Sequence, residues 1–160
     1  PHKLVTAVLP PNTTMGDTLN ALNLINFEAS FCCYLVGLLN SLVLDWRVRQ
    51  IAKNVHVKPI SLLQLPIPPF EGEATQAIAR CAAQLLYTDE RFADLAEPLN
   101  VTGVREPRER QRLKNEIDAR VALLYGLTAD ELQYILTKFP KVDEAIKAGV
   151  MEEYRRLAAK

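Results

Sequence analysis

Long apolar runs and histidines are scarce in this 160-residue sequence. The first shortage argues against a membrane-spanning protein and the second against a zinc protein. The longest apolar stretch, 31–44, contains Asn40 and Ser41 and falls short of the ~18–20 residues that span a membrane. It predicts a buried core helix. The two histidines, His2 and His56, are too few to suggest a zinc site.

Glycine and cysteine are too scattered to form a recognisable site. The six glycines are isolated from one another, so no phosphate-binding loop is visible. Cys32 and Cys33 are adjacent in an apolar stretch and Cys81 stands alone, which fits neither a disulfide framework nor a metal site. We expect buried free thiols in a reducing cytoplasm. Because the first residue is Pro1 and no signal peptide follows it, we expect the chain to begin inside a longer protein.

Neither sign of charge prevails, because 19 Lys and Arg residues balance 19 Asp and Glu residues. Zero net charge gives no bulk attraction to nucleic acid. The distribution is less even, since residues 1–70 hold five basic and three acidic side chains, and four of these basic residues lie between positions 47 and 58. This cluster is the only electrostatic indication of a site.

The first part of the chain predicts a strand followed by a long helix. Residues 3–9 are aliphatic or β-branched and end at Pro10 and Pro11, which is typical of a strand. A polar loop is expected over 12–18. From about 19 to 52, apolar residues recur at steps of three and four, which predicts one long helix with a wide apolar face.

A second extended stretch is expected over 54–70. Val55 and Val57 alternate with His56 and Lys58, which would place the two basic side chains on one face of a strand. The prolines of this stretch exclude a central, fully paired strand, so we expect an edge or irregular segment.

Composition changes at Glu71, after which helix formers prevail. A capping box of sequence T-A-D-E begins one helix at Thr128, and this helix should end before Pro140. Periodic apolar positions predict further helices over about 73–86, 91–96, 107–125 and 142–160.

These elements predict an α+β fold that is predominantly α-helical. A small sheet from about 3–9 and 55–67 would pack on the long helix and be followed by a helical C-terminal tail. The expected division of the chain is into residues 1–70 and 71–160.

The tetrapeptide Ile67-Pro68-Pro69-Phe70 is similar to one that amine methyltransferases use in catalysis. There a polar residue precedes Pro-Pro-aromatic and accepts hydrogen bonds from the exocyclic amine of a flipped base. Ile67 cannot accept a hydrogen bond. No nucleophile with a nearby histidine and no set of converging carboxylates is apparent either. We therefore expect this chain by itself to be no enzyme, with no catalytic residue, metal or cofactor.

Three stretches share a likeness to a single family. They are V-T-A-V-L-P-P at 5–11, L-L-N-S-L-V-L-D-W-R-V-R-Q at 38–50 with H-V-K-P-I-S-L-L-Q-L-P-I-P at 56–68, and the stretch 113–140 with its pattern D…A.LYGLT..EL.YIL..FP. Together they resemble the C-terminal target-recognition and helical region of an adenine-specific DNA methyltransferase or a type IIG-like restriction–modification protein. The third stretch is the most specific, and it is similar to the tail of fused methylases of restriction and phage-defence systems.

The resemblance implies sequence-specific recognition of double-stranded DNA by a fragment without its N-terminal methyltransferase domain. The parent protein would use S-adenosylmethionine, and whether it also carries a nuclease stays open. Arginine and lysine would mainly contact phosphates, and an arginine can also read guanine. The DNA-facing residues that the resemblance implies are Asn12, Thr13, Thr14, Arg47, Arg49, Lys53, His56 and Lys58.

Two alternatives remain. The helices of 73–160 could form a structural or subunit-interaction module with no direct DNA contact, which zero net charge favours. The chain could also belong to a catalytic body, against which Ile67 argues. Arg47, Arg49 and Lys53 have a simpler interpretation too, because cations stabilise the negative end of a helix.

Overall fold

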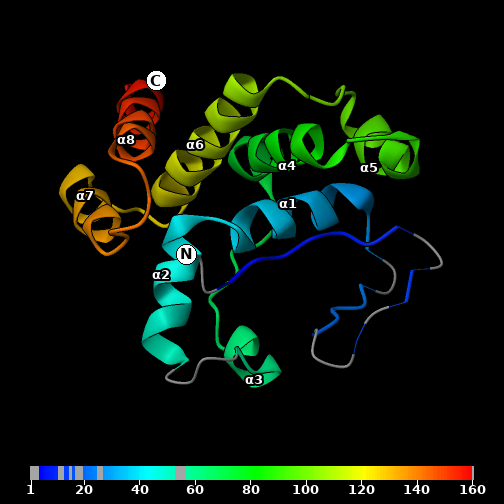
Figure 1. Ribbon diagram of the computed structural model, residues 1–160, viewed down its shortest axis with the longest axis horizontal. Coiled ribbons are helices and arrows are strands. Elements are labelled where there is room, and N and C mark those ends of the chain that lie inside the picture. Colours follow the sequence, from blue (N-terminus) through cyan, green and yellow to red (C-terminus); the bar gives the residue numbers. More distant parts are fainter. Residues whose placement is uncertain are drawn as a thin grey trace.

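All regular elements in the described residues are helices (Figure 1). The computed structural model describes residues 4–10, 13–14, 16, 20–24, 27–52 and 57–159. The elements are α1 (Ala29–Leu39), α2 (Leu42–Ile51), α3 (Pro59–Leu63), α4 (Gly72–Leu86), α5 (Ala93–Ala96), α6 (Pro107–Leu124), α7 (Ala129–Thr137) and α8 (Glu144–Ala158), with short 3-10 helices at Glu90–Phe92 and Glu97–Leu99.

The predicted α+β fold is wrong, because the described part of the chain contains no strand and no sheet. Residues 4–9 run as a lone extended segment that is tied to helices by side chains. In the second predicted strand, 59–63 is the short helix α3. Pro59 begins this helix, where its fixed φ suits the first turn and its missing N–H leaves no donor unsatisfied. Val55 and His56 lie outside the described residues.

The single long helix predicted over 19–52 is two helices. Residues 20–24 and 27–28 are not helical, and α1 starts only at Ala29. The chain breaks again at Asn40 and Ser41, where the Ser41 side chain accepts a hydrogen bond from Leu44 N and so caps α2. Within the described ranges no single helix is long and apolar enough to cross a membrane. Only α1 and α2 together meet that criterion, and they bend by 67° at the break.

The helices predicted after residue 70 are confirmed, with bounds close to those expected. Pro107 opens α6, and Gly126 adopts a φ of +67° just after it, a conformation that L side chains rarely take. The capping box is present, since the Thr128 hydroxyl accepts from Glu131 N while the Glu131 carboxylate accepts from Thr128 N.

The core is a stack in which α1 packs on α4, α4 on α6, and α6 on α8 (Figure 1). Gly37 permits the close approach of α1 to α4, because a Cβ there would lie 3.0 Å from a methyl group of Ile78 and 3.2 Å from Ala82. One buried cluster includes residues from both sides of the predicted boundary at residue 70, among them Leu38 and Val121. The division into 1–70 and 71–160 stays a prediction.

Candidate functional site

The break between α1 and α2 is where the extended N-terminal segment is attached. Asn40, the residue that ends α1, accepts a hydrogen bond from Thr6 N at 2.9 Å and donates one to Thr6 O at 2.9 Å. Its side-chain amide therefore satisfies both main-chain groups of Thr6, as a residue of a neighbouring strand would. Asn40 and Ser41 also donate hydrogen bonds to main-chain carbonyls of α1, Asn40 to Val36 O and Ser41 to Leu38 O.

Asp45 is a second attachment point and is fully buried. Its carboxylate accepts a hydrogen bond from Leu4 N at 2.6 Å and one from Arg49 Nε at 2.9 Å. The Arg49 guanidinium also lies over the Phe139 ring, 4.5 Å from its centroid. Arg49 therefore joins α2 to Phe139, two residues after the end of α7, and this internal role competes with the DNA contact predicted for it.

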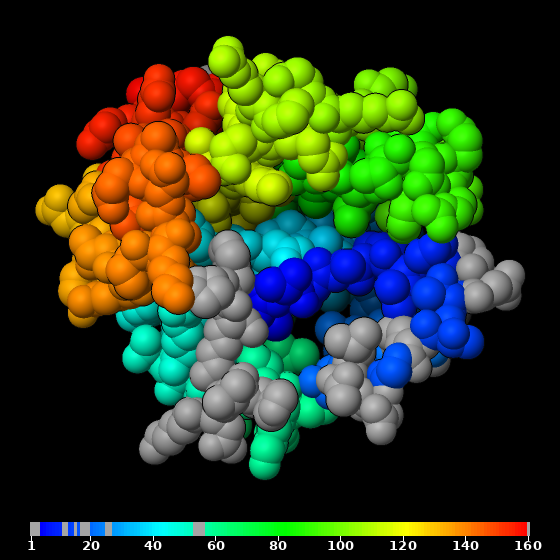
Figure 2. Space-filling view, viewed as in Figure 1, coloured from blue at the N-terminus to red at the C-terminus, as the bar shows by residue number. Residues whose placement is uncertain are grey.

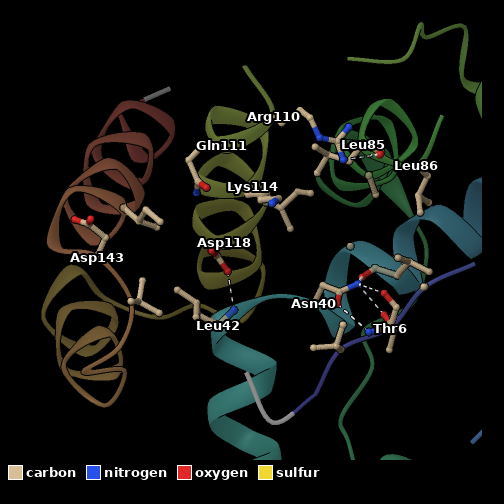
Figure 3. A pocket seen from close by; sticks show the side chains of 18 of the residues that line it. Thr6, Asn40, Leu42, Leu85, Leu86, Arg110, Gln111, Lys114, Asp118 and Asp143 are labelled. Atoms are coloured by element: carbon tan, nitrogen blue, oxygen red, sulfur yellow. Dashed lines mark hydrogen bonds between the residues drawn. The ribbon is translucent and has the colours of Figure 1, made fainter. Parts of the chain in front are cut away.

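A third buried contact joins α2 to α6. Asp118 on α6 accepts a hydrogen bond at 2.7 Å from Leu42 N, the first N–H of α2 (Figure 3). This N–H has no partner within its own helix, so a carboxylate from a distant segment caps it. Burial raises the pKa of Asp118 from 3.8 to about 7, although the bond from Leu42 favours the ionised form.

The proline-rich segment 66–70 is held by two tyrosines. Tyr34 of α1 donates to Pro68 O at 2.9 Å, and Tyr125 donates to Pro66 O at 2.7 Å. Tyr34 also stacks on Phe70, with ring centroids 5.2 Å apart. The segment that resembles a catalytic tetrapeptide is thus bound through its main-chain carbonyls, which is a packing role.

A cavity of about 660 Å³ lies between α1, α4, α6 and the turn before α8, with residues 5–7 along one side (Figure 3). Its walls are largely apolar. Arg110, at its edge, donates to Val104 O at 2.7 Å and to Leu85 O at 3.0 Å. Asn40 and Asp118 also line it, and both hold main-chain groups. Because these polar side chains connect segments, the cavity resembles a packing surface more than a reaction centre.

The predicted DNA-facing residues divide into four groups. Arg47 and Lys58 are exposed, and neither forms an ion pair within the described ranges. Arg49 is bound to Asp45, so it is only partly available. Thr13 and Thr14 are exposed, but the described residues between 13 and 24 lie on the right of Figure 1 while α2 lies on the left. Asn12, Lys53 and His56 lie outside the described residues.

A second group of basic residues, Arg105, Arg108, Arg110 and Arg112, lies around the start of α6. Within the described residues only Arg112 of this group pairs with carboxylates, those of Glu109 and Glu116. Glu116 lies near three guanidinium groups, with distances of 3.2 Å to Arg112, 2.6 Å to Arg120 and 3.9 Å to Arg156. Its side chain is only 10% exposed, so these pairs belong to the α6–α8 interface.

The hydrogen bond by which Arg110 holds the end of α4 was not predicted, because no local pattern shows which carbonyls a side chain will reach.

The thiols are not poised for reaction. Cys33 and Cys81 are buried and all three cysteines are free. Burial raises the pKa of Cys33 to about 12 and that of Cys81 to about 11, which keeps both protonated. In the described part of the chain, no three His, Cys, Asp or Glu side chains are grouped to hold a metal ion.

No protein-family model, curated protein or solved structure matches this chain.

Proposed function

We propose that this chain is the non-catalytic C-terminal part of the target-recognition unit of an adenine-specific DNA methyltransferase or restriction–modification protein. The surface of α2 and α3 would face double-stranded DNA. The parent protein would be cytoplasmic, and its methyltransferase domain, supplied by the rest of the polypeptide, would bind S-adenosylmethionine.

One observation carries this proposal: the three stretches that resemble the family contact one another through residues that define the likeness. Asn40 of L-L-N-S holds Thr6 of V-T-A-V-L-P-P. The aspartate that opens the third pattern, Asp118, caps the helix that begins at Leu42. Tyr125 of L-Y-G-L-T holds Pro66 of L-P-I-P. A pattern shared across distant segments is expected when its residues make the contacts between those segments.

The same observation separates architecture from DNA contact. Arg49 and Asp45 belong to the internal contacts, whereas Arg47 and Lys58 are exposed. In Figure 1, α2 and α3 lie in the lower part of the view, and the start of α6 lies at the top. Arg47 and Lys58 are therefore the side chains best placed to contact phosphates without any loss of internal structure.

The test is binding of a mixed-sequence duplex to the chain, measured by fluorescence anisotropy between about 50 and about 200 mM salt. We expect affinity to fall steeply with salt. The double variant Arg47→Ala/Lys58→Ala should bind more weakly, with a salt slope smaller by roughly two, because two phosphate contacts are lost.

A matched control is Arg108→Ala/Lys114→Ala, which removes one exposed arginine and one exposed lysine from α6. It has the same net charge as the test variant and should bind like the wild type. Equal loss of affinity in both variants would indicate general electrostatic attraction, and no binding at low salt would refute DNA recognition by this chain.

The alternative is a structural or subunit-interaction module with no direct DNA contact. An exposed apolar side chain on these helices favours it, since Tyr134 of α7 is 56% exposed. The absence of duplex binding, together with association between copies or with another subunit, would support this alternative.

A further inference from the structure

The extended segment 4–9 has the alternation of a strand although no strand pairs with it. Leu4 is buried at 6% exposure, Thr6 and Val8 are half-buried, and Ala7 is exposed. Val5 and Leu9 are 74% and 45% exposed. Even-numbered side chains therefore face the helices and odd-numbered ones face outward, which is the period of two that an extended chain imposes. Val5 and Ala7 also border the cavity between α1, α4 and α6.

Only one edge of this segment forms hydrogen bonds within the described residues. Leu4 N bonds to Asp45 and Thr6 N bonds to Asn40, so the main-chain groups of even-numbered residues point toward the junction of α1 and α2. In an extended chain the groups of odd-numbered residues point the opposite way. Within the described ranges, the main-chain groups of Val5, Ala7 and Leu9 have no hydrogen bond.

We propose that the open edge of residues 5–9 pairs with the same edge of a second copy of the chain, as two antiparallel strands. A two-fold axis at Ala7 places Ala7 opposite Ala7 of the second copy, and Val5 opposite Leu9 of the second copy. Each opposed pair exchanges two N–H···O=C bonds, so the free groups of odd-numbered residues are satisfied together. Pro10, which has no N–H, falls on the even-numbered, inner edge and removes no donor.

The chemistry of the segment favours a second copy as the occupant. Residues 4–10 carry no charge, and the whole chain has zero net charge, so neither local nor long-range repulsion opposes pairing of identical edges. The exposed side chains of Val5 and Leu9 meet across the pair and bury apolar surface. Figure 2 shows residues 4–9, in blue, crossing the visible face of the molecule. A contact of one short strand is small, so the dimer forms at high protein concentration.

Disulfide trapping tests the register. Ala7→Cys should form a disulfide-linked dimer under mild oxidation, because opposed residues of a hydrogen-bonded pair have Cα atoms about 5.5 Å apart. Val8→Cys is the matched control, because its side chain faces the helices, and it should stay monomeric. Trapping of both variants alike, or of neither, contradicts the pairing.

Sedimentation equilibrium tests the hydrogen bonds. The wild type should show a mass that rises toward that of a dimer with concentration. Ala7→Pro removes an outward N–H and should weaken dimerisation roughly tenfold or more, whereas Val8→Pro removes an inward N–H that no described group uses and should leave it unchanged. A wild type that stays monomeric overturns the proposal, as does a dimer that Ala7→Pro does not weaken. Circular dichroism of both proline variants establishes that each is folded.

Discussion

Asp45 and Asp118 are buried carboxylates that accept main-chain N–H groups from other segments. Each replaces a bond that a neighbouring strand or a local helix cap would otherwise supply. Asp45 gains a guanidinium partner as well, while Asp118 has a main-chain donor and no ion pair in the described residues. The two carboxylates therefore respond differently to mutation and to pH.

Removal of the Asp45 carboxylate breaks the hydrogen bond from Leu4 N and the ion pair with Arg49. We expect Asp45→Ala to lower the free energy of unfolding by roughly 2–4 kcal/mol, because a buried donor loses its acceptor and a largely covered cation loses an ion pair. Urea denaturation measures this. The control Arg47→Ala, on the same helix but exposed, should change stability by less than about 0.5 kcal/mol.

Asp118 makes stability depend on pH. With a pKa of about 7 in the folded protein against 3.8 when unfolded, the folded state holds the proton more tightly. Its contribution to stability is therefore full below pH 4, falls as pH rises from about 4 to about 7, and stays low above that.

The variant Asp118→Asn keeps an oxygen that can accept from Leu42 N and cannot ionise. We expect it to be more stable than the wild type by roughly 1–3 kcal/mol at pH 8, and by much less at pH 4. Urea denaturation of both proteins at the two pH values measures the difference. A stability difference that does not change with pH would show that Asp118 does not titrate in this way.

At the scale of elements, helices were predictable wherever apolar spacing and end signals agreed. Pro107, Gly126 and Thr128 gave the ends of α6 and the start of α7 correctly. The absence of a sheet from the described residues was not predictable, because residues 4–9 do have the composition and alternation of a strand. Only the tertiary structure shows that Asn40 and Asp45 take the place of a neighbouring strand. The role of Arg49 was not predictable for the same reason, because only the tertiary structure shows that its guanidinium packs on Phe139 of a distant segment.

The capping box provides a test of one element's end. Thr128→Ala removes the acceptor of Glu131 N and should lower the free energy of unfolding by about 1 kcal/mol. Thr137→Ala is the same substitution at the other end of α7, where the hydroxyl only donates to Tyr134 O, and it should cost a few tenths. Thermal unfolding of both variants compares the two ends, and equal costs would contradict a specific cap.

At the scale of the whole molecule, α1 packs on α4 across the predicted boundary, and one buried cluster continues into α6 and α8. We therefore expect a single cooperative unfolding transition. Fluorescence of Trp46, the only tryptophan, reports on α2, whereas far-ultraviolet circular dichroism reports on all helices. Coincident urea midpoints are predicted, and a fluorescence transition that precedes the loss of helix would indicate two units.

The central claim, that the α2 and α3 surface faces DNA, is tested most directly by hydrogen–deuterium exchange of the chain with and without a mixed-sequence duplex at low salt. We predict that the duplex slows exchange in peptides covering α2 and α3, around Arg47 and Lys58, and leaves α8 unchanged. Slower exchange confined to α6 and α8, or no change anywhere at saturating duplex, would contradict the claim.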